Sequence, residues 1–219
     1  MASPDSITAG GPVSLEREWW LRVLAVLVRP RPVFVALRVE DEDDLSARQE
    51  PILLVLWLAG MAGVLLSPQW SELLDQSGVD ALVVAVLTFV AGGFYAAGGY
   101  FLAGAALYLG ARSLGSLGSW RLARQVLAFA CVPLAASFLL TLPVGLGVFG
   151  GDLFRHGGAD GGAAGAAYLG YRLLFVAWSL ALLLYGVRTA YGWSWARSAG
   201  ALLLLVVFLV VLSLVGVLL

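Results

Sequence analysis

The chain has 219 residues, of which 61% are hydrophobic and only 12% are charged. Soluble domains carry charge on roughly a quarter of their residues, so this balance excludes an ordinary soluble globular protein. The formal net charge of −1 provides no general attraction to nucleic acid, and we expect no nucleic-acid partner.

The N-terminal region predicts a tail and a surface helix. Residues 1–13 are rich in Gly, Ser and Pro and are expected to be disordered. Residues 14–50 are expected to form a cytoplasmic amphipathic and acidic segment, whose helix runs to about Arg29 and is too short and too charged to span a bilayer. Trp19 and Trp20 suit the headgroup depth of a helix that lies in the membrane interface. A helix packed on the protein's own bundle fits the same pattern, so both interpretations stay open.

The next residues predict where this helix ends. Pro30 and Pro32 are expected to stop it, with one more surface turn over residues 33–38. The acidic run at residues 40–44 predicts a solvated linker. No cleavable signal peptide opens the chain, so insertion is expected to rely on the first true span.

Long apolar blocks predict an all-α, polytopic membrane protein with five transmembrane helices in one domain over residues 51–219. The spans are expected at about 51–67, 79–109, 120–149, 163–187 and 199–219. The second is longer than the ~20 residues that a bilayer needs, so it must tilt, protrude or break at Gly98-Gly99. Its Gly and Ala residues recur at four-residue spacings, which lets helix backbones approach closely. We favour packing within one chain, and a homo-oligomer seam stays open.

The third and fourth spans hold the candidate functional residues. Pro133 and Pro143 should kink the third span, and such kinks are usually structural but occasionally line a cavity. Arg172 lies inside the fourth span, where an ionisable group is costly and therefore a functional candidate. Tyr168 and Phe175 share its helix face and could stack on it. The alternative is that Arg172 reaches the outer interface, or meets Asp152 or Asp160 there.

Little in the chain supports catalysis or metal binding. The single Cys131 excludes an internal disulfide and a cysteine metal cluster, and the single His156 excludes a histidine-pair metal site. His156 lies near Asp152 and Asp160, but no nucleophile–base pair accompanies them, so a solvated loop is expected. With no P-loop, dinucleotide fingerprint or H-E-x-x-H motif, we expect no catalytic residue, cofactor or metal.

The distribution of arginine predicts the topology. Eleven of the 13 basic residues, all of them Arg, fall before the first span and in the second and fourth loops, whereas only Arg155 falls on the other side. The positive-inside rule then places the N-terminus in the cytoplasm and the C-terminus outside. The polar turn between the last two spans holds Arg188 and Arg197 with aromatic residues between them, as expected at a cytoplasmic membrane boundary.

Three stretches resemble the Yip1 family of small five-span membrane proteins in its bacterial form. RPRPVFVAL at Arg29–Leu37 resembles the P-x-x-x-F segment before the family's first span. Residues 109–133, LGARSLGSLGSWRLARQVLAFACVP, resemble its glycine turn, polar helix start and proline, and Pro143 matches a second proline. Residues 178–199, WSLALLLYGVRTAYGWSWARSA, resemble its ending, with Arg197 at the basic position. The resemblance implies a five-helix bundle over residues 29–219 of a bacterial inner membrane, and no catalytic residues to carry over.

These patterns predict a non-enzymatic, multi-pass inner-membrane protein that acts through a membrane or cytoplasmic protein partner, or on membrane lipids. Its expected contact surface is residues 14–38 together with the turn at Arg188–Arg197. The alternative is a small transporter or channel subunit, in which the kinked third span and Arg172 line an anionic path. Transporters usually carry several polar groups at mid-depth, and this chain has one ionisable residue there.

Overall fold

The structure is a computed structural model that describes residues 13–39, 49–66, 81–154 and 161–218. Every element in these ranges is helical, as the all-α prediction expects. The elements are α1 (Val13–Val28), α2 (Pro30–Val39), α4 (Gln49–Leu66), α6 (Ala81–Gly98), the π-helical turn η1 (Gly99–Ala103), α7 (Gly104–Ser113), α8 (Trp120–Ala130), α9 (Val132–Phe149), the 3₁₀ turn η2 (Gly150–Phe154), α10 (Gly162–Tyr191) and α11 (Trp195–Leu218). Residues 1–12 and the acidic run at 40–44 lie outside the described ranges, so the tail and linker predictions are not addressed there.

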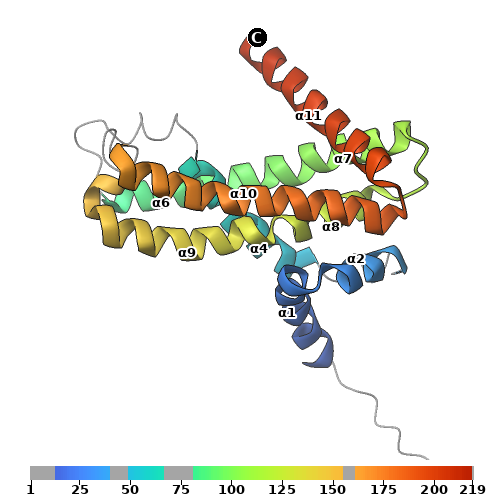
Figure 1. Ribbon diagram of the computed structural model, residues 1–219, viewed down its shortest axis with the longest axis horizontal. Helices are drawn as coiled ribbons and strands as arrows, with labels where there is room; N and C mark the ends of the chain where they lie inside the picture. Colours follow the sequence, from blue (N-terminus) through green and yellow to red (C-terminus); the bar gives the residue numbers. More distant parts are fainter. Residues whose placement is uncertain (1–12, 40–48, 67–80, 155–160, 219) are drawn as a thin grey trace, which may run out of the picture.

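The long helices lie along one direction, and two others leave it. α9 and α10 run side by side along the long axis, and α4 packs against both α6 and α9 (Figure 1). α1 runs steeply across this direction, and α11 leaves the bundle obliquely towards the C-terminus (Figure 1). α1 and α2 both lie beneath the long helices in this view, and α1 contacts α2 and α9 (Figure 1).

Four apolar segments are long enough to cross a membrane, which is consistent with a polytopic membrane protein. They are Leu82–Ser113, Trp120–Leu153, Gly162–Tyr191 and Trp195–Leu212, and a shorter apolar helix covers Ile52–Leu66. Two helices extend beyond the spans predicted from hydropathy: α10 continues past residue 187 to Tyr191, and α11 begins at Trp195, ahead of residue 199. Hydropathy misses these ends because the terminal turns of both helices extend into polar sequence.

The second apolar segment changes from α-helix to π-helix directly after Gly98, where the sequence allowed a break, but it continues as one helix to Ser113. The Arg124 guanidinium carbon lies 5.0 Å from the ring centroid of Tyr100 in this turn, and 5.6 Å from that of Phe101. A Cβ at position 104 would stand 2.6 Å from the Arg124 side chain, so Gly104 leaves room for this cation–π contact. Arg124 therefore packs against the π-helical turn, a role that sequence reasoning missed.

The third apolar segment breaks where Pro133 predicts it. α8 ends at Ala130 and α9 begins at Val132, with Cys131 between them. Pro133 has no N–H, so the carbonyl four residues earlier loses its helical donor. The Cys131 N–H still bonds the carbonyls of Leu127 and Ala128, each at 3.1 Å, so the helical hydrogen bonds of α8 continue up to this residue. Pro143 causes no such break in the helix, because α9 continues through it to Phe149.

α4 and α6 meet through glycine, which supports packing within the chain for this part of the small-residue pattern. A Cβ on Gly60 of α4 would stand 2.2 Å from the Gly92 carbonyl oxygen of α6 and 2.9 Å from the Ala96 nitrogen. Beside this contact, the Trp57 indole donates a hydrogen bond to the Phe89 carbonyl at 3.0 Å. The two helix backbones thus approach each other closely without intervening side chains.

The predicted surface turn over residues 33–38 is wrong, because these residues belong to helix α2. Pro30 and Pro32 stand in its first turn, where backbone N–H groups have no helical partner, so both prolines fit without losing a hydrogen bond. Phe34 is fully buried, and a Cβ on Gly186 of α10 would stand 2.7 Å from its ring. α2 is therefore docked on α10 through its apolar face.

α1 combines features of both interpretations that the sequence left open. Val23 and Val26 are buried, so one face of α1 packs on the protein. Leu21, Leu24 and Val28 are 60%, 62% and 79% exposed. The helix therefore also carries an apolar face that nothing in the described chain covers. Trp19 and Trp20 lie on α1, but their side chains are outside the description.

Candidate functional site

One end of the molecule gathers arginines and aromatic rings around the connection between α10 and α11. Gly192 has φ +68°, a left-handed conformation that suits glycine and closes α10 after Tyr191. The N–H of Trp193 bonds back to the Arg188 carbonyl at 2.9 Å. The polar turn is thus shorter than predicted, because Arg188 lies in the last turn of α10 and Arg197 lies inside α11.

Arg197 connects this turn to the end of α7. Its Nε donates to the Leu114 carbonyl at 3.0 Å, and its Nη2 donates to the same oxygen. Leu114 is the C-cap of α7, so the bonds satisfy a carbonyl at a helix end. The guanidinium carbon also lies 4.5 Å from the Trp193 ring centroid. Arg197 therefore holds the turn against the α7–α8 loop, which is a structural role.

Arg188 instead lines a cavity of about 560 Å³ between α2 and the end of α10. Its lining residues are Arg31, Val35, Arg38, Tyr185, Arg188, Thr189, Gly192 and Trp193, and we name the cavity the arginine pocket. Among the described residues that line it, three carry a guanidinium group and none carries a carboxylate, and the acidic run at 40–44 that follows α2 lies outside the described ranges. The sequence predicted Arg188 as a boundary residue, and only the fold brings Arg31 and Arg38 to it.

The Arg188 side chain is held by stacking on the Trp195 ring and by burial of its Nε atom. Its guanidinium carbon lies 4.5 Å from the ring centroid of Trp195, so one face of the guanidinium is stacked. Its Nε is buried and has no hydrogen-bond partner within the described residues. The Nη1 atom of Arg38 lies 2.9 Å from where a Cβ on Gly192 would stand, so glycine leaves room for this guanidinium.

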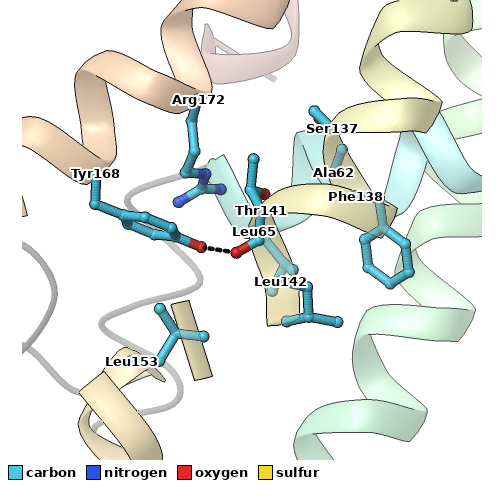
Figure 2. A pocket seen from close by; sticks show the side chains of 9 residues that line it. All are labelled: Ala62, Leu65, Ser137, Phe138, Thr141, Leu142, Leu153, Tyr168 and Arg172. Atoms are coloured by element: carbon cyan, nitrogen blue, oxygen red, sulfur yellow. Dashed lines mark hydrogen bonds between the residues drawn. The ribbon is translucent and has the colours of Figure 1, made fainter. Parts of the chain in front are cut away.

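Arg172 lines a second, much smaller cavity between α4, α9 and α10 (Figure 2). The cavity has a volume of about 30 Å³, and Ser137 and Thr141 contribute to its wall. The Arg172 guanidinium carbon lies 5.7 Å from the ring centroid of Tyr168, which confirms that predicted contact. The Tyr168 hydroxyl in turn donates to the Thr141 carbonyl at 3.0 Å, drawn as the dashed line in Figure 2.

The predicted stacking of Phe175 on Arg172 is wrong. The Phe175 ring pairs instead with Tyr171, at 5.4 Å between centroids, and with Trp178, at 6.4 Å. Because Tyr171 and Trp178 on the same helix pack against the Phe175 ring, this ring does not stack on Arg172. Of the two carboxylates that Arg172 was expected to meet, Asp152 lies in η2 and Asp160 lies outside the described ranges. Arg155 and His156 also lie outside them.

The remaining sequence candidates lie apart from both cavities. Pro133 and Pro143 line neither the arginine pocket nor the Arg172 cavity. From the sequence, Arg31 and Arg38 entered only the count of arginines that predicts the membrane topology. A helical wheel would have placed them on one face, since they are seven residues apart, but Pro30 and Pro32 argued against a helix there. Among the described residues, no group of three or more His, Cys, Asp and Glu side chains is placed to hold a metal ion.

Comparison with protein-family models identifies a Yip1 domain over residues 24–217. The match covers both walls of the arginine pocket and all four long apolar segments. No curated protein and no solved structure matches the chain.

Proposed function

The chain belongs to the Yip1 family, and from this membership we propose that it acts through a protein partner, or on the bilayer, at the cytoplasmic face of a bacterial inner membrane. The family consists of generally non-enzymatic membrane proteins related to trafficking. In this proposal α4 is the first of five spans, α1 lies on the membrane surface, and the contact surface is formed by α1, α2 and the α10–α11 turn.

The length of α10 supports this placement. Its 30 residues extend about 45 Å at 1.5 Å per residue, whereas the hydrocarbon core is about 30 Å thick. Several turns of α10 therefore protrude from the core. Arg188 lies in the final turn, and the arginines of α2 lie beside it in the arginine pocket. Three of the arginines that the sequence assigned to the cytoplasmic side, Arg31, Arg38 and Arg188, thus lie together, which supports this orientation under the positive-inside rule.

The observation that carries the proposal is the exposed apolar face of α1. Leu21, Leu24 and Val28 point away from the protein's own core, on a helix that crosses the direction of the long helices (Figure 1). If the long helices follow the membrane normal, α1 lies along the membrane plane. An apolar face in that position suits the headgroup boundary or an apolar surface of a partner.

The first test replaces this face while leaving the buried face of α1 intact. In the triple variant Leu21→Ser, Leu24→Ser and Val28→Ser, we expect retention of a stoichiometric partner to fall by at least about tenfold. Each side chain of this size contributes roughly 1.5–3 kcal/mol when buried, and 1.4 kcal/mol is a factor of ten. The measurement is affinity purification from native membranes in mild detergent, followed by quantitative mass spectrometry.

Leu117 provides the control for this experiment. It is 99% exposed in the α7–α8 loop, so Leu117→Ser removes an exposed leucine from outside the proposed surface. Equal retention in the triple variant and in wild type would contradict the role of α1. A wild-type protein that purifies without any partner would contradict the partner mechanism and leave action on the bilayer.

The second candidate function, transport, is supported by the Arg172 cavity alone. Two hydroxyl-bearing residues line this cavity with Arg172, and the hydroxyl of one of them, Ser137, donates to the Leu134 carbonyl at 2.7 Å. The cavity's volume of about 30 Å³ has room for two or three water molecules, each needing about 10–15 Å³. The Arg172 cavity itself therefore forms no open ion path in this conformation.

A flux measurement separates the two functions. Under the partner proposal, proteoliposomes containing wild-type protein, Arg172→Leu or Arg172→Lys should all show the same background anion flux. Flux in wild type that Arg172→Lys keeps and Arg172→Leu loses would instead establish transport through this cavity, because only the lysine variant retains a cation.

A further inference from the structure

The arginine pocket brings together three guanidinium groups from two helices. Arg31 and Arg38 come from α2, whereas Arg188 lies about 150 residues later in the sequence, on α10. The buried contact of Phe34 with α10 holds the two helices together. Apolar packing thus keeps cationic groups close, and their mutual repulsion is relieved when an anion binds between them.

Arg188 also carries an unused donor. Its Nε is buried and lacks a hydrogen-bond partner in the described chain. A buried donor left without an acceptor is unfavourable, and a small movement of the side chain that exposes the Nε to a phosphate oxygen would remove that penalty. Because Trp195 stacks on one face of the guanidinium, the side chain is held in place, and its N–H groups remain available in the guanidinium plane.

The other lining residues suit an oxygen-rich ligand. Tyr185 and Thr189 add hydroxyl groups to the wall. Gly192 adds space, because any side chain there would meet the Arg38 guanidinium and is further disfavoured by the positive φ. The volume of about 560 Å³ falls within the roughly 300–1,000 Å³ of small-molecule sites, and is larger than a chloride ion requires.

We propose that the arginine pocket binds a phosphate group, supplied either by the headgroup of an anionic phospholipid or by a soluble phosphate. Guanidinium groups present paired donors that match phosphate oxygens, and basic pockets between helices at the cytoplasmic side recognise lipid headgroups. This inference rests on the proposed function, because it requires the pocket to face the cytoplasmic membrane surface. It adds that the proposed contact surface recognises a phosphate group at the arginine pocket.

The test uses the full-length protein, purified in detergent and titrated separately with short-chain phosphatidic acid, short-chain phosphatidylcholine and inorganic phosphate. Intrinsic tryptophan fluorescence reports binding, since Trp193 lines the pocket and Trp195 stacks on Arg188. Native mass spectrometry then identifies the bound species by mass. We expect the double variant Arg31→Gln and Arg38→Gln to bind phosphatidic acid about tenfold to a hundredfold more weakly than wild type, since it loses two charged donors.

The matched control is Arg29→Gln with Arg112→Gln. Both arginines are exposed and neither lines the pocket, so this variant has the same net charge as the pocket variant. A third variant, Arg188→Gln, tests the buried donor. Because it could also disturb the stack on Trp195, its folding is checked by thermal unfolding, and the exposed pair remains the deciding comparison.

The outcomes are distinct. Binding of phosphatidic acid but not inorganic phosphate, lost in the pocket variant alone, supports a lipid headgroup. Binding of both with the same sensitivity supports a soluble phosphate site. Equal loss in the pocket and control variants, or no binding in wild type, overturns the inference. Partner retention is measured in the same variants, so normal retention without phosphate binding refutes the phosphate site and leaves the proposed function standing.

Discussion

Replacing Gly60 with valine is expected to separate α4 from α6 and to prevent the protein from reaching its folded bundle. A Cβ at this position would stand 2.2 Å from the Gly92 carbonyl oxygen and 2.9 Å from the Ala96 nitrogen. Both atoms belong to the backbone of α6, so no side-chain rotation relieves the overlap. Overpacking typically costs about 1–3 kcal/mol even where side chains can shift, so we expect on the order of 3 kcal/mol or more here.

The measurement is denaturant-induced unfolding in detergent, followed by the fluorescence of Trp57, which hydrogen-bonds across the same helix pair. Gly60→Ala should already show most of the effect, because the Cβ alone produces the overlap. Gly63 is the control on the same helix, since a Cβ there would meet only the Tyr95 ring at 4.0 Å. Gly63→Ala should be neutral or slightly stabilising. Equal stability of the two alanine variants would show that the helices do not approach at Gly60.

Replacing Phe34 with alanine is expected to undock α2. The side chain is fully buried, and truncating a buried phenylalanine typically costs about 3–5 kcal/mol. Because α2 has few other buried residues, chiefly Val33 and Leu37, we expect local detachment before the bundle unfolds. Amide hydrogen exchange should therefore increase sharply over residues 30–39. Phosphate binding in the arginine pocket should fall with it, since α2 supplies two of the guanidinium groups.

Val35 is the control for this substitution. It lies on the same helix but is 43% exposed, so Val35→Ala should change stability by about 0.5 kcal/mol or less. If Phe34→Ala and Val35→Ala gave the same exchange rates, α2 would be held by something other than the Phe34 contact. That result would also remove the structural basis for bringing Arg31 and Arg38 to Arg188.

Several features of the fold were predictable because their causes are local. Long apolar blocks predict membrane helices from hydropathy alone. The break at Pro133 follows from a missing N–H, and the change at Gly98 occurs in a segment that was too long and rich in glycine. The contact of Arg172 with Tyr168 was predictable for the same reason, because residues four apart on a helix are neighbours.

Other features depend on which residues pack against one another, and residue spacing along the sequence does not determine this. Small residues at four-residue intervals indicate close helix packing, but they do not identify the partner, and only the structure pairs Gly92 with Gly60. Phe175 had several aromatic neighbours on its helix, and packing directed it to Tyr171 and Trp178. α2 was missed because Pro30 and Pro32 disfavour a helix interior, whereas both stand in a first turn that tolerates them.

Composition and motifs within single segments are enough to show that this chain is helical, apolar enough to cross a membrane and a member of its family. The meeting of Arg31 and Arg38 with Arg188 in one pocket becomes visible only in the folded protein. The physical reason is that the buried contact between Phe34 and Gly186 joins segments about 150 residues apart, and no periodicity within either segment encodes that pairing.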